Sequence, residues 1–471
     1  MYRAYITRVT NIRPAENADR LNACEVFGNT TIIDKTITED DTIVYFPSDG
    51  QISVEFGEKN NLFYRKDEAG NNVGGFIDPV KRRITAIRLR GNRSDGLVLP
   101  LSCLNYCYEH GDASAEFCVG DVIEGCVNGH DICQKYIPHH QNKQNNMATN
   151  NRTRKIKVEV APLFSEHADT EQLAYNLSAF KPGDQIEITL KMHGTSQRTG
   201  YLPVFKGYKR TFWDKILRRE GTPIYDWGYV SGTRRTVLED YEGGYYGSNA
   251  FREAHSKKFE GKLWKGETVY YEVVGFTDTG APIMGSCGNE KLGKDFVKQY
   301  GKETVFSYGC YPTGGIEPEY HDENCGAPYI VKGPQSDIYV YRMTMTNEDG
   351  NVIEYTPEFM RYRCEQMGIK TVPIFWREFL GGNDCPYADD CLFKDCNIGE
   401  CVKTIAESYY DGVDPIGKTH VREGVVVRIV NRPKFTAFKH KNYSFKVLSG
   451  IAVEKMEANG GEVNADIASE M

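Results

Sequence analysis

The chain has 471 residues, of which 40% are hydrophobic and 26% charged. This composition is ordinary for a globular protein of two or three domains. No run of apolar residues reaches the ~20 positions that a membrane helix needs. A formal net charge of −8 is not that of a protein whose whole surface binds nucleic acid, although an enzyme can confine positive charge to one groove.

Residues 1–7 alternate like a strand and lack the apolar segment of a signal peptide. We therefore expect a cytoplasmic protein, of a cell or of a virus-infected host, with no membrane contact. The fourteen cysteines are scattered along the chain, and we expect them to be reduced. The densest group comprises Cys385, Cys391, Cys396 and Cys401. Its gaps are wider than in the Cys-x-x-Cys pairs of structural zinc sites, so we expect free cysteines, with a zinc site as the alternative.

Residues 1–133 predict a β-rich domain, because short alternating runs are broken by turn residues. The clearest runs are 2–9, 30–34, 42–46 and 83–89, a spacing that favours a small closed barrel. The segments 8–21 and 88–97 resemble parts of OB-fold domains. That resemblance implies an OB-like nucleic-acid-binding domain, with a barrel that only braces the next domain as the alternative.

A tract of Asn, Gln and His residues is too poor in apolar groups to pack, so we predict a polar linker at 134–155. The second domain then covers 156–450, in which strands alternate with short helices. Insertions interrupt it near 282–334 and near 381–401, and a polar tail occupies 451–471.

Two helices are marked by their ends. Thr170 is placed to cap a short helix that carries Leu173 and Leu177 on one face. Further along, Thr356 is followed by a proline, which is typical of a helix start, and Gly368 is typical of a helix stop.

The segment 185–191 predicts a strand that ends in a lysine. Its apolar residues fall on one face, while Glu187, Thr189 and Lys191 fall on the other. A glycine, Gly194, and two hydroxyl residues follow. A lysine before such a turn is a candidate covalent nucleophile, because glycine lets backbone amides approach a phosphate. An exposed lysine before a tight turn is the alternative.

The segment 191–196, which reads Lys-Met-His-Gly-Thr-Ser, resembles motif I of the lysyl-AMP nucleotidyltransferases, which comprise RNA ligases, DNA ligases and capping enzymes. Its Lys-x-His-Gly-Thr form is most similar to RNA ligases. Five further segments resemble motifs Ia, III, IIIa, IV and V of the superfamily in the expected order. They are 231–235, 270–275, 337–342, 422–428 and 438–441.

The resemblance implies that Lys191 attacks ATP and becomes lysyl-AMP. A free lysine is charged at pH 7, so we expect Lys439, Lys441 and a bound metal to lower its pKa. Two lysines on one strand face repel each other unless an anion such as a triphosphate lies between them. For Glu423 the resemblance implies a contact to Mg²⁺ or Mn²⁺. For Glu272 it implies ribose hydroxyls or metal-bound water, with a salt bridge as the alternative.

The remaining roles are implied in the same way. Arg234 would bind the 5′-phosphate, either Ile338 or Tyr339 would pack on the adenine, and His193 would contact a phosphate or serve a structural role. Leu190 departs from the acidic residue that many ligases carry before the lysine, which leaves purine recognition open. The implied nucleotide-binding set is Lys191, His193, Gly194, Arg234, Glu272, Ile338, Tyr339, Lys439 and Lys441, and the implied metal-binding pair is Glu423 and Glu272.

Only residues 447–471 follow motif V, too few for the C-terminal OB domain of DNA ligases and capping enzymes or the helical domain of other phage-type RNA ligases. The order of parts resembles the Deinococcus-type RNA ligases. The expected fold is α+β: an OB-like β-barrel, then a mixed nucleotidyltransferase domain built on antiparallel sheets, an ATP-grasp-like ligase core.

The implied activity is an ATP-dependent RNA ligase that joins 5′-phosphate and 3′-hydroxyl ends. Its partners would be RNA ends, in single strands or in nicked RNA or RNA/DNA duplexes, with no protein partner evident. One alternative is a DNA ligase or a GTP-dependent capping-type enzyme. Another is a non-ligating protein that binds RNA ends on a ligase scaffold.

Overall fold

The computed structural model divides into an N-terminal unit that contains residues 1–139 and a C-terminal unit that contains residues 140–467. The residues that it describes are 2–137, 159–168, 170–217, 219, 221–234, 236–238, 241, 248–278, 283–284, 293–300, 336–381, 397–416 and 421–458.

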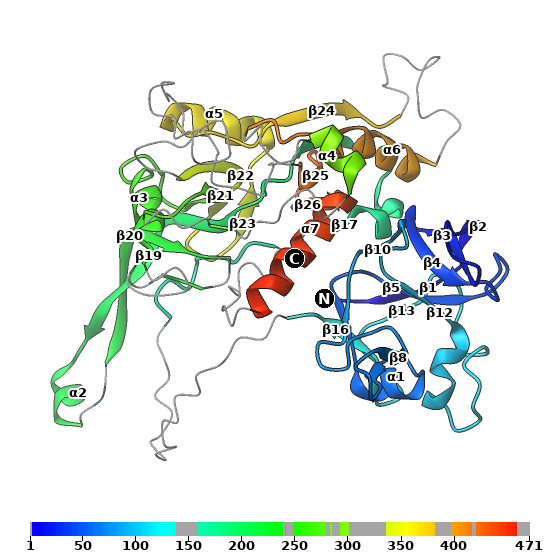
Figure 1. Ribbon diagram of the computed structural model, residues 1–471. Coiled ribbons are helices and arrows are strands. Elements are labelled where there is room, and N and C mark those ends of the chain that lie inside the picture. The colour runs from blue at the N-terminus through cyan, green and yellow to red at the C-terminus, as the bar shows by residue number, and fades with distance from the viewer. Residues whose placement is uncertain are drawn as a thin grey trace. The chain divides into compact units, whose positions relative to one another are not determined.

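The N-terminal unit is built from short antiparallel strands (Figure 1). A four-stranded sheet has the order β12 (Leu97–Pro100), β5 (Ile43–Phe46), β1 (Ala4–Thr7), β13 (Val122–Ile123). Two three-stranded sheets have the orders β2 (Thr10–Pro14), β3 (Leu21–Val26), β4 (Asn29–Asp34) and β16 (Cys133–Lys135), β6 (Gly50–Ile52), β9 (Arg83–Ile84). The strand pairs are β7 (Tyr64–Lys66) with β8 (Asn72–Gly74), β10 (Ile87–Leu89) with β11 (Asn92–Ser94), and β14 (Cys126–Val127) with β15 (His130–Asp131). The helices are α1 (Val54–Lys59) and the 3-10 helix η1 (Leu101–Cys107).

The predicted closed OB-like barrel is not confirmed. Among the described residues the strands of this unit pair into separate sheets, and none of these sheets closes on itself. Phe27 (50°) and Arg90 (50°) have positive φ in the hairpin turns that join β3 to β4 and β10 to β11. The run 83–89, expected as one strand, forms two strands, β9 and β10, that pair in different sheets.

The C-terminal unit holds two five-stranded sheets. The first sheet has the order β17 (Glu171–Gln172), β26 (Thr436–Lys441), β25 (Gly424–Ile429), β18 (Gln185–Leu190), β24 (Ile374–Phe379). The second sheet has the order β20 (Thr222–Gly232), β19 (Thr195–Lys209), β21 (Glu267–Gly275), β22 (Ser336–Thr346), β23 (Val352–Glu354). The helices are α2 (Phe212–Ile216), α3 (Ala250–Lys257), α4 (Lys294–Tyr300), α5 (Pro357–Met367), α6 (Ile398–Tyr410) and α7 (Tyr443–Ala458). Apart from the parallel pair β17–β26, the strands run antiparallel, so the predicted α+β class with antiparallel sheets is confirmed.

The first sheet has one apolar face and one polar face, because side chains alternate along each strand. Ile186 and Ile188 of β18 join Val425 and Val427 of β25 in a core cluster that also contains Val402 of α6. The alternation predicted for 185–191 is therefore confirmed. The opposite face carries Thr189, Lys439 and their neighbours, and it is here called the polar face.

One of the two helix predictions is confirmed. Thr356 caps α5 by accepting from the N–H of Phe359, and Gly368 ends it in the left-handed conformation at φ 68°. The prediction of a short helix after Thr170 is wrong. Two 3-10 turns, η2 (Leu173–Tyr175) and η3 (Leu177–Ala179), form instead, separated at Asn176, whose φ of −130° is not helical.

The predicted linker, insertions and tail fall partly within helices or strands and partly outside the described residues. The predicted linker 134–155 begins inside β16, and residues 138–158 lie outside the described residues. Most of both insertions, 282–334 and 381–401, lies outside them too, although α6 begins within the second. Helix α7 continues into the predicted tail 451–471. In the described part of the chain, no helix is long and apolar enough to cross a membrane.

Cys401, in α6, is disulfide-bonded, which corrects the expectation that all cysteines are reduced. The other three members of that cysteine group lie outside the described residues. The described cysteines of the N-terminal unit are free thiols. Within the described ranges there is no group of three or more His, Cys, Asp or Glu side chains that could hold a metal ion, so the zinc alternative gains no support there.

A buried ion pair anchors α5 to the second sheet. The Arg363 guanidinium donates to both oxygens of Glu267 at 2.8 Å, and the Glu267 side chain is fully buried. The substitution Glu267→Ala leaves a buried guanidinium unpaired, so we expect it to lower the free energy of unfolding by about 3–5 kcal/mol, measured by urea titration. Glu253→Ala, which removes the exposed pair with Lys257 on α3, is the control and should change it by less than about 0.5 kcal/mol. Equal effects would contradict the assignment.

Candidate active site

Lys191 follows the last residue of β18, at the edge of the polar face. Its N–H donates to the carbonyl oxygen of Gly424 at 3.0 Å, which holds the backbone of Lys191 against the start of β25. Its Nζ lies 2.8 Å from Oε1 of Glu423, and the lysine side chain is only 15% exposed. The candidate nucleophile is therefore a fixed, nearly buried ammonium group and not a solvated surface lysine.

The Glu423 carboxylate gathers the residues of this site. It is 2% exposed, and besides Lys191 it contacts Nζ of Lys441 at 3.3 Å and Nδ1 of His193 at 2.9 Å. Burial alone would raise the pKa of Glu423, but the charges of Lys191 and Lys441 and the bond from His193 outweigh it and hold the pKa well below its ordinary value. Glu423 is thus an anion at neutral pH, stabilised by Lys191 and His193 from the turn after β18 and by Lys441 from the end of β26.

His193 lies between Glu423 and helix α7. Its ring packs edge-on against Phe445 of α7 at 4.7 Å between centroids. Burial lowers the pKa of His193 to about 4, with Lys191 and Lys441 also lowering it and Glu423 opposing. The ring is therefore neutral at pH 7, and it can donate to Glu423 only if Nδ1 carries the proton.

Positive charge is in excess on the polar face. Strand register pairs Lys441 with Gly424, and Lys439 with Val426, which in turn pairs with Thr189. Paired residues share a face, so Lys439 and Lys441 lie on the same face as Thr189. Besides Lys191, Lys439 and Lys441, this face carries Arg428 and the carboxylates of Glu187 and Glu423. Cations therefore outnumber anions there, and this balance suits a polyanionic ligand.

Gly194 is required by a close approach between strands. A Cβ atom on it would lie 2.3 Å from the carbonyl oxygen of Val273 and 3.0 Å from Cγ of Glu272. The sequence suggested glycine for contact with a phosphate. In the structure its visible reason is this packing, which draws the turn after Lys191 against β21 and next to Glu272.

The register of the second sheet separates Ile338 from Tyr339. Ser196 is opposite Glu272, and Glu272 is opposite Tyr339, so these three side chains share one face. Ile338 is instead opposite Val273, on the other face. Of the two residues considered for adenine packing, Tyr339 is therefore the one on the side of Glu272.

Arg252 of α3 is a residue that the sequence did not single out. It is 1% exposed, its Nη2 donates to Oγ1 of Thr195 at 2.6 Å, and its Nη1 donates to the carbonyl oxygen of Ser196 at 3.2 Å. Gln197 in turn donates to the carbonyl oxygen of Arg252 at 2.9 Å. Arg252 thus holds the first residues of β19 behind the Lys191 turn.

Arg234 belongs to a second group of charges, centred on His167. Burial lowers the pKa of His167 well below 6.5, and the nearby charges of Arg342, Arg234 and Arg198 lower it further. Arg342 Nη1 donates to Nδ1 of this ring at 3.3 Å. Arg234 is therefore grouped with His167, whereas the direct partners of Lys191 described above are Glu423 and the backbone of Gly424.

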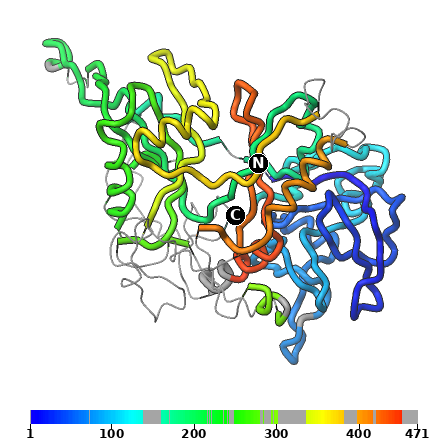
Figure 2. Tube along the Cα trace, turned by 90° about the horizontal axis from the view of Figure 1, so that it is seen from above, coloured from blue at the N-terminus to red at the C-terminus, as the bar shows by residue number. Residues whose placement is uncertain are grey.

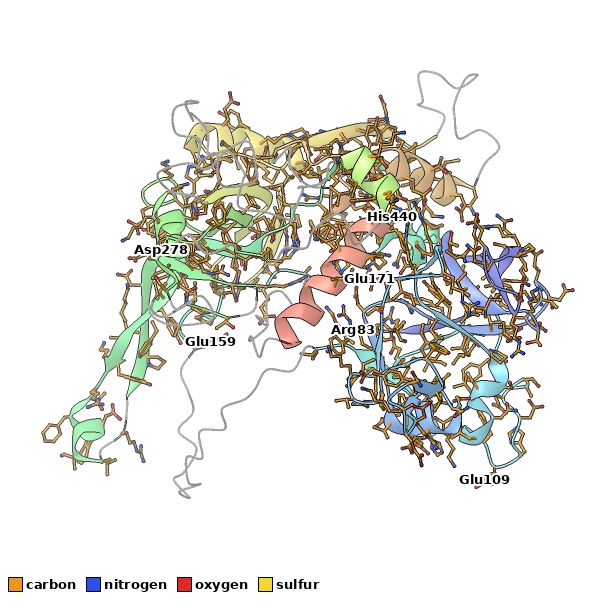
Figure 3. The ribbon with its side chains drawn as sticks, viewed as in Figure 1. Arg83, Glu109, Glu159, Glu171, Asp278 and His440 are labelled. Atoms are coloured by element: carbon orange, nitrogen blue, oxygen red, sulfur yellow. The ribbon has the colours of Figure 1, made fainter. Side chains whose placement is uncertain are left out.

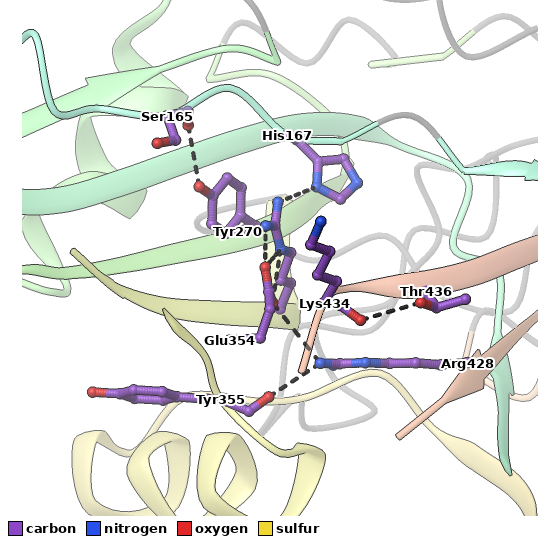
Figure 4. A network of polar contacts seen from close by, with 9 residues as sticks. Ser165, His167, Tyr270, Glu354, Tyr355, Arg428, Lys434 and Thr436 are labelled. Carbon is purple, nitrogen blue, oxygen red and sulfur yellow. Dashed lines mark hydrogen bonds and ion pairs between the residues drawn. The ribbon is translucent and has the colours of Figure 1, made fainter. Parts of the chain in front are cut away.

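Glu354 of β23 connects this second group to the first sheet (Figure 4). Its carboxylate accepts from Nε of Arg342 at 3.0 and 3.1 Å, and it lies 3.9 Å from Nη2 of Arg428 on β25. Arg428 also donates to the carbonyl oxygen of Tyr355 at 3.1 Å. These contacts tie β22 and β23 of the second sheet to β25 of the first. His440 of β26, labelled in Figure 3, shares the opposite, apolar face of the first sheet with Val425 and stacks on Tyr410 of α6.

Comparisons with known proteins agree on the fold. A structure of Naegleria gruberi RNA ligase with pyrophosphate is 16% identical and has a TM-score of 0.50, with 97% of this chain and 98% of that chain covered. A glutamate-to-alanine variant of that ligase with ATP and Mn is 17% identical and also has a TM-score of 0.50, with 96% and 99% covered. No family model matches the chain, and no curated protein matches it.

Gly194→Ala tests the close approach of the Lys191 turn to β21. The contact at 2.3 Å is to backbone, so we expect the substitution to lower the free energy of unfolding by about 1–3 kcal/mol in a denaturant titration. Gly450→Ala is the control. It lies within α7, and a Cβ atom there would meet nothing within 4 Å, so alanine should raise stability by up to about 1 kcal/mol. A Gly194→Ala protein as stable as the unsubstituted chain would contradict the packing explanation.

Proposed function

We propose that this chain is an ATP-dependent RNA ligase that joins 5′-phosphate and 3′-hydroxyl ends, with Lys191 as its nucleophile. The observation that carries the proposal is the contact of Lys191 with the buried carboxylate of Glu423, beside Lys441 and His193. A lysine held in this way at a strand end, with excess positive charge around it, is suited to receive a polyphosphate. The ordered series of ligase-like motifs supports the same reading, whereas the resemblance to the Deinococcus-type enzymes rests on the expected order of domains, with the OB-like domain first.

ATP is the substrate of the first step, and the geometry suggests how it would bind. Lys439 and Lys441 share the polar face, where their charges can neutralise phosphate oxygens. Tyr339 and Glu272 share a face of the second sheet. Tyr339 can pack on the adenine, while Glu272 can accept hydrogen bonds from the ribose hydroxyls. Arg234, in the group around His167, remains our candidate for the 5′-phosphate of the RNA.

The protonation state of Lys191 must change before it can react. Its contact with the anionic Glu423 favours the charged ammonium form, which cannot attack phosphorus. Lys441 contacts the same carboxylate oxygen at 3.3 Å, so Glu423 keeps a cationic partner when Lys191 loses its proton. Because the pKa of Glu423 is held well below its usual range, this carboxylate is a poor base, and the proton must leave to solvent or to a phosphate oxygen.

The donor set at Glu423 fits a divalent cation that keeps most of its water. Both carboxylate oxygens already contact Lys191, Lys441 or His193. A metal ion at this position would therefore contact Glu423 through its bound water molecules and not directly. A bound Mg²⁺ or Mn²⁺ would neutralise charge on the phosphates during transfer.

The reaction then has three steps. Nζ of Lys191 forms a bond to the α-phosphorus of ATP, the bond to the pyrophosphate oxygen breaks, and the lysine nitrogen loses a proton. The 5′-phosphate of an RNA end next attacks the same phosphorus and releases the lysine. Finally a 3′-hydroxyl attacks the activated 5′-phosphate and AMP leaves. Each step is an in-line transfer in which positioning and charge neutralisation supply most of the catalysis.

Lys191→Ala should abolish the covalent adduct, because it removes the nucleophile. The measurement is incubation with labelled ATP and Mg²⁺, followed by a denaturing gel, with labelled GTP and NAD⁺ in parallel lanes. Lys35→Ala, at an exposed position of the N-terminal unit, is the control and should keep the adduct. An adduct that persists without Lys191, or that forms only from GTP, would overturn the proposed reaction.

Glu423→Gln should slow adduct formation about 10- to 100-fold at limiting Mg²⁺, since a residue that holds a metal through water typically contributes this much. Glutamine keeps the size of the side chain and its bond to His193. The matched control is Glu407→Gln, where the carboxylate lies 3.5 Å from Nε2 of His440. The rate is measured as labelled adduct against Mg²⁺ concentration, and a Glu423→Gln rate equal to that of the control removes Glu423 from the site.

A further inference from the structure

The hairpin of β19 and β20 extends beyond the rest of the second sheet. β19 pairs with β21 only as far as Gly200, whereas its pairing with β20 continues to Lys209. Its outer part is therefore a two-stranded ribbon, and α2 lies at the tip (Figure 1). The view from above also shows this ribbon reaching away from the remainder of the C-terminal unit (Figure 2).

Aromatic side chains form a row along one face of this hairpin. Tyr201 is opposite Tyr229, Phe205 is opposite Tyr225, and Trp227 lies two residues from both tyrosines of β20. These five side chains therefore share a face. The rings of Tyr201 and Tyr229 stack at 4.7 Å, Tyr201 lies 5.9 Å from Trp227, and Phe205 lies 6.0 Å from Tyr225. All five are partly exposed, so ring surface remains open to a ligand.

The tip of the hairpin continues this aromatic surface. Tyr208 packs edge-on against the outer end of the row. In α2, Phe212 is 71% exposed and Trp213 is 66% exposed. Thr211 and Asp214 close a capping box at the start of α2. Two large aromatic side chains are thus held in solvent by an ordered turn, although burying such side chains would be favourable.

Positive charge accompanies the aromatic row. The segment 203–227 contains six Lys and Arg residues against three Asp and Glu residues, in a chain whose net charge is −8. Lys209 and Arg210 are exposed beside α2, as is Arg219. Nζ of Lys265 lies 5.3 Å from the centre of the Trp227 ring. The hairpin therefore combines exposed rings with the opposite charge to that of the whole protein.

We propose that this aromatic face of the hairpin, from Tyr229 to Trp213, binds a single strand of nucleic acid. Bases would stack on the rings, and phosphates would lie against Lys209, Arg210 and Lys265. Such stacking is independent of base identity, because every base has a flat face. The identification of the strand as RNA rests on the proposed function, whereas the binding of a strand rests on the hairpin alone.

The chemistry favours an unpaired strand over other occupants. A duplex hides the faces of its bases, so the aromatic row would contribute little to its binding. A protein segment would need acidic and apolar groups in alternation to match the row. A single strand supplies negative charge and flat apolar rings at every nucleotide, which is the combination that the hairpin presents.

The test uses the full chain and a fluorescent oligouridylate with a 5′-phosphate, with affinity measured by polarisation across a salt series. Phe212→Ala with Trp213→Ala should weaken binding about tenfold or more, since each lost stack contributes several-fold. Lys209→Ala with Arg210→Ala should weaken binding and reduce the slope of log K against log salt by about 1.4. Binding of a blunt RNA duplex should be the same for the aromatic variant and the unsubstituted chain.

Matched controls lie elsewhere on the C-terminal unit. Lys294→Ala with Lys298→Ala removes two exposed charges from α4, and Tyr362→Ala removes an exposed ring from α5; both should leave affinity within about twofold of the unsubstituted chain. Labelling by ATP should be equal in all of these variants, so a failure of the proposed ligase chemistry is seen separately. Unchanged oligouridylate affinity in both hairpin variants, or an equal loss in the controls, would overturn the proposal.

Discussion

The arrangement of the C-terminal unit depends on the contacts of one buried carboxylate, that of Glu423. A buried anion without partners would lower the stability of the folded protein by several kcal/mol. The folded structure therefore requires all of the Glu423 partners to be in place. They come from the turn that follows β18 and from the end of β26. Strand register places Lys441 beside Glu423, because the start of β25 at Gly424 pairs with the end of β26 at Lys441. Helix α7 then closes the group through Phe445, whose ring covers His193.

Much of this site was predictable because alternation along a strand is a local property. The pattern of 185–191 determined which side chains reach the polar face, and the spacing of Lys439 and Lys441 put both on one face. The ends of α5 were equally readable, since Thr356 and Gly368 act through their own backbone neighbours. Each of these inferences needs only residues within a few positions of one another.

The parts that escaped prediction depend on contacts distant in sequence. Nothing in the sequence distinguishes Arg252 from other helical residues. Its partner Thr195 is 57 positions away and is brought to it only by the fold. The need for glycine at 194 comes from β21, which the turn meets only after the second sheet has formed. The expected barrel failed for a related reason. Alternating runs predict strands, but closure depends on which strands pair, and the short strands of this unit pair into separate sheets.

The acidity of the whole chain and the proposed nucleic-acid chemistry are reconciled by where the charges lie. The polar face around Lys191 and the hairpin of β19 and β20 are each locally positive, so the remaining residues carry more negative charge than the −8 of the whole chain. A single strand, β19, connects the two regions. It begins at Thr195, just after the Lys191 turn, and its 15 residues span about 50 Å at about 3.3 Å each. Side chains alternate along β19, so Tyr201 and Phe205 lie on the opposite face of the sheet from Ser196 and Glu272. An RNA strand stacked on the aromatic row would therefore have to cross to the other face of the sheet before its terminus reached Lys191.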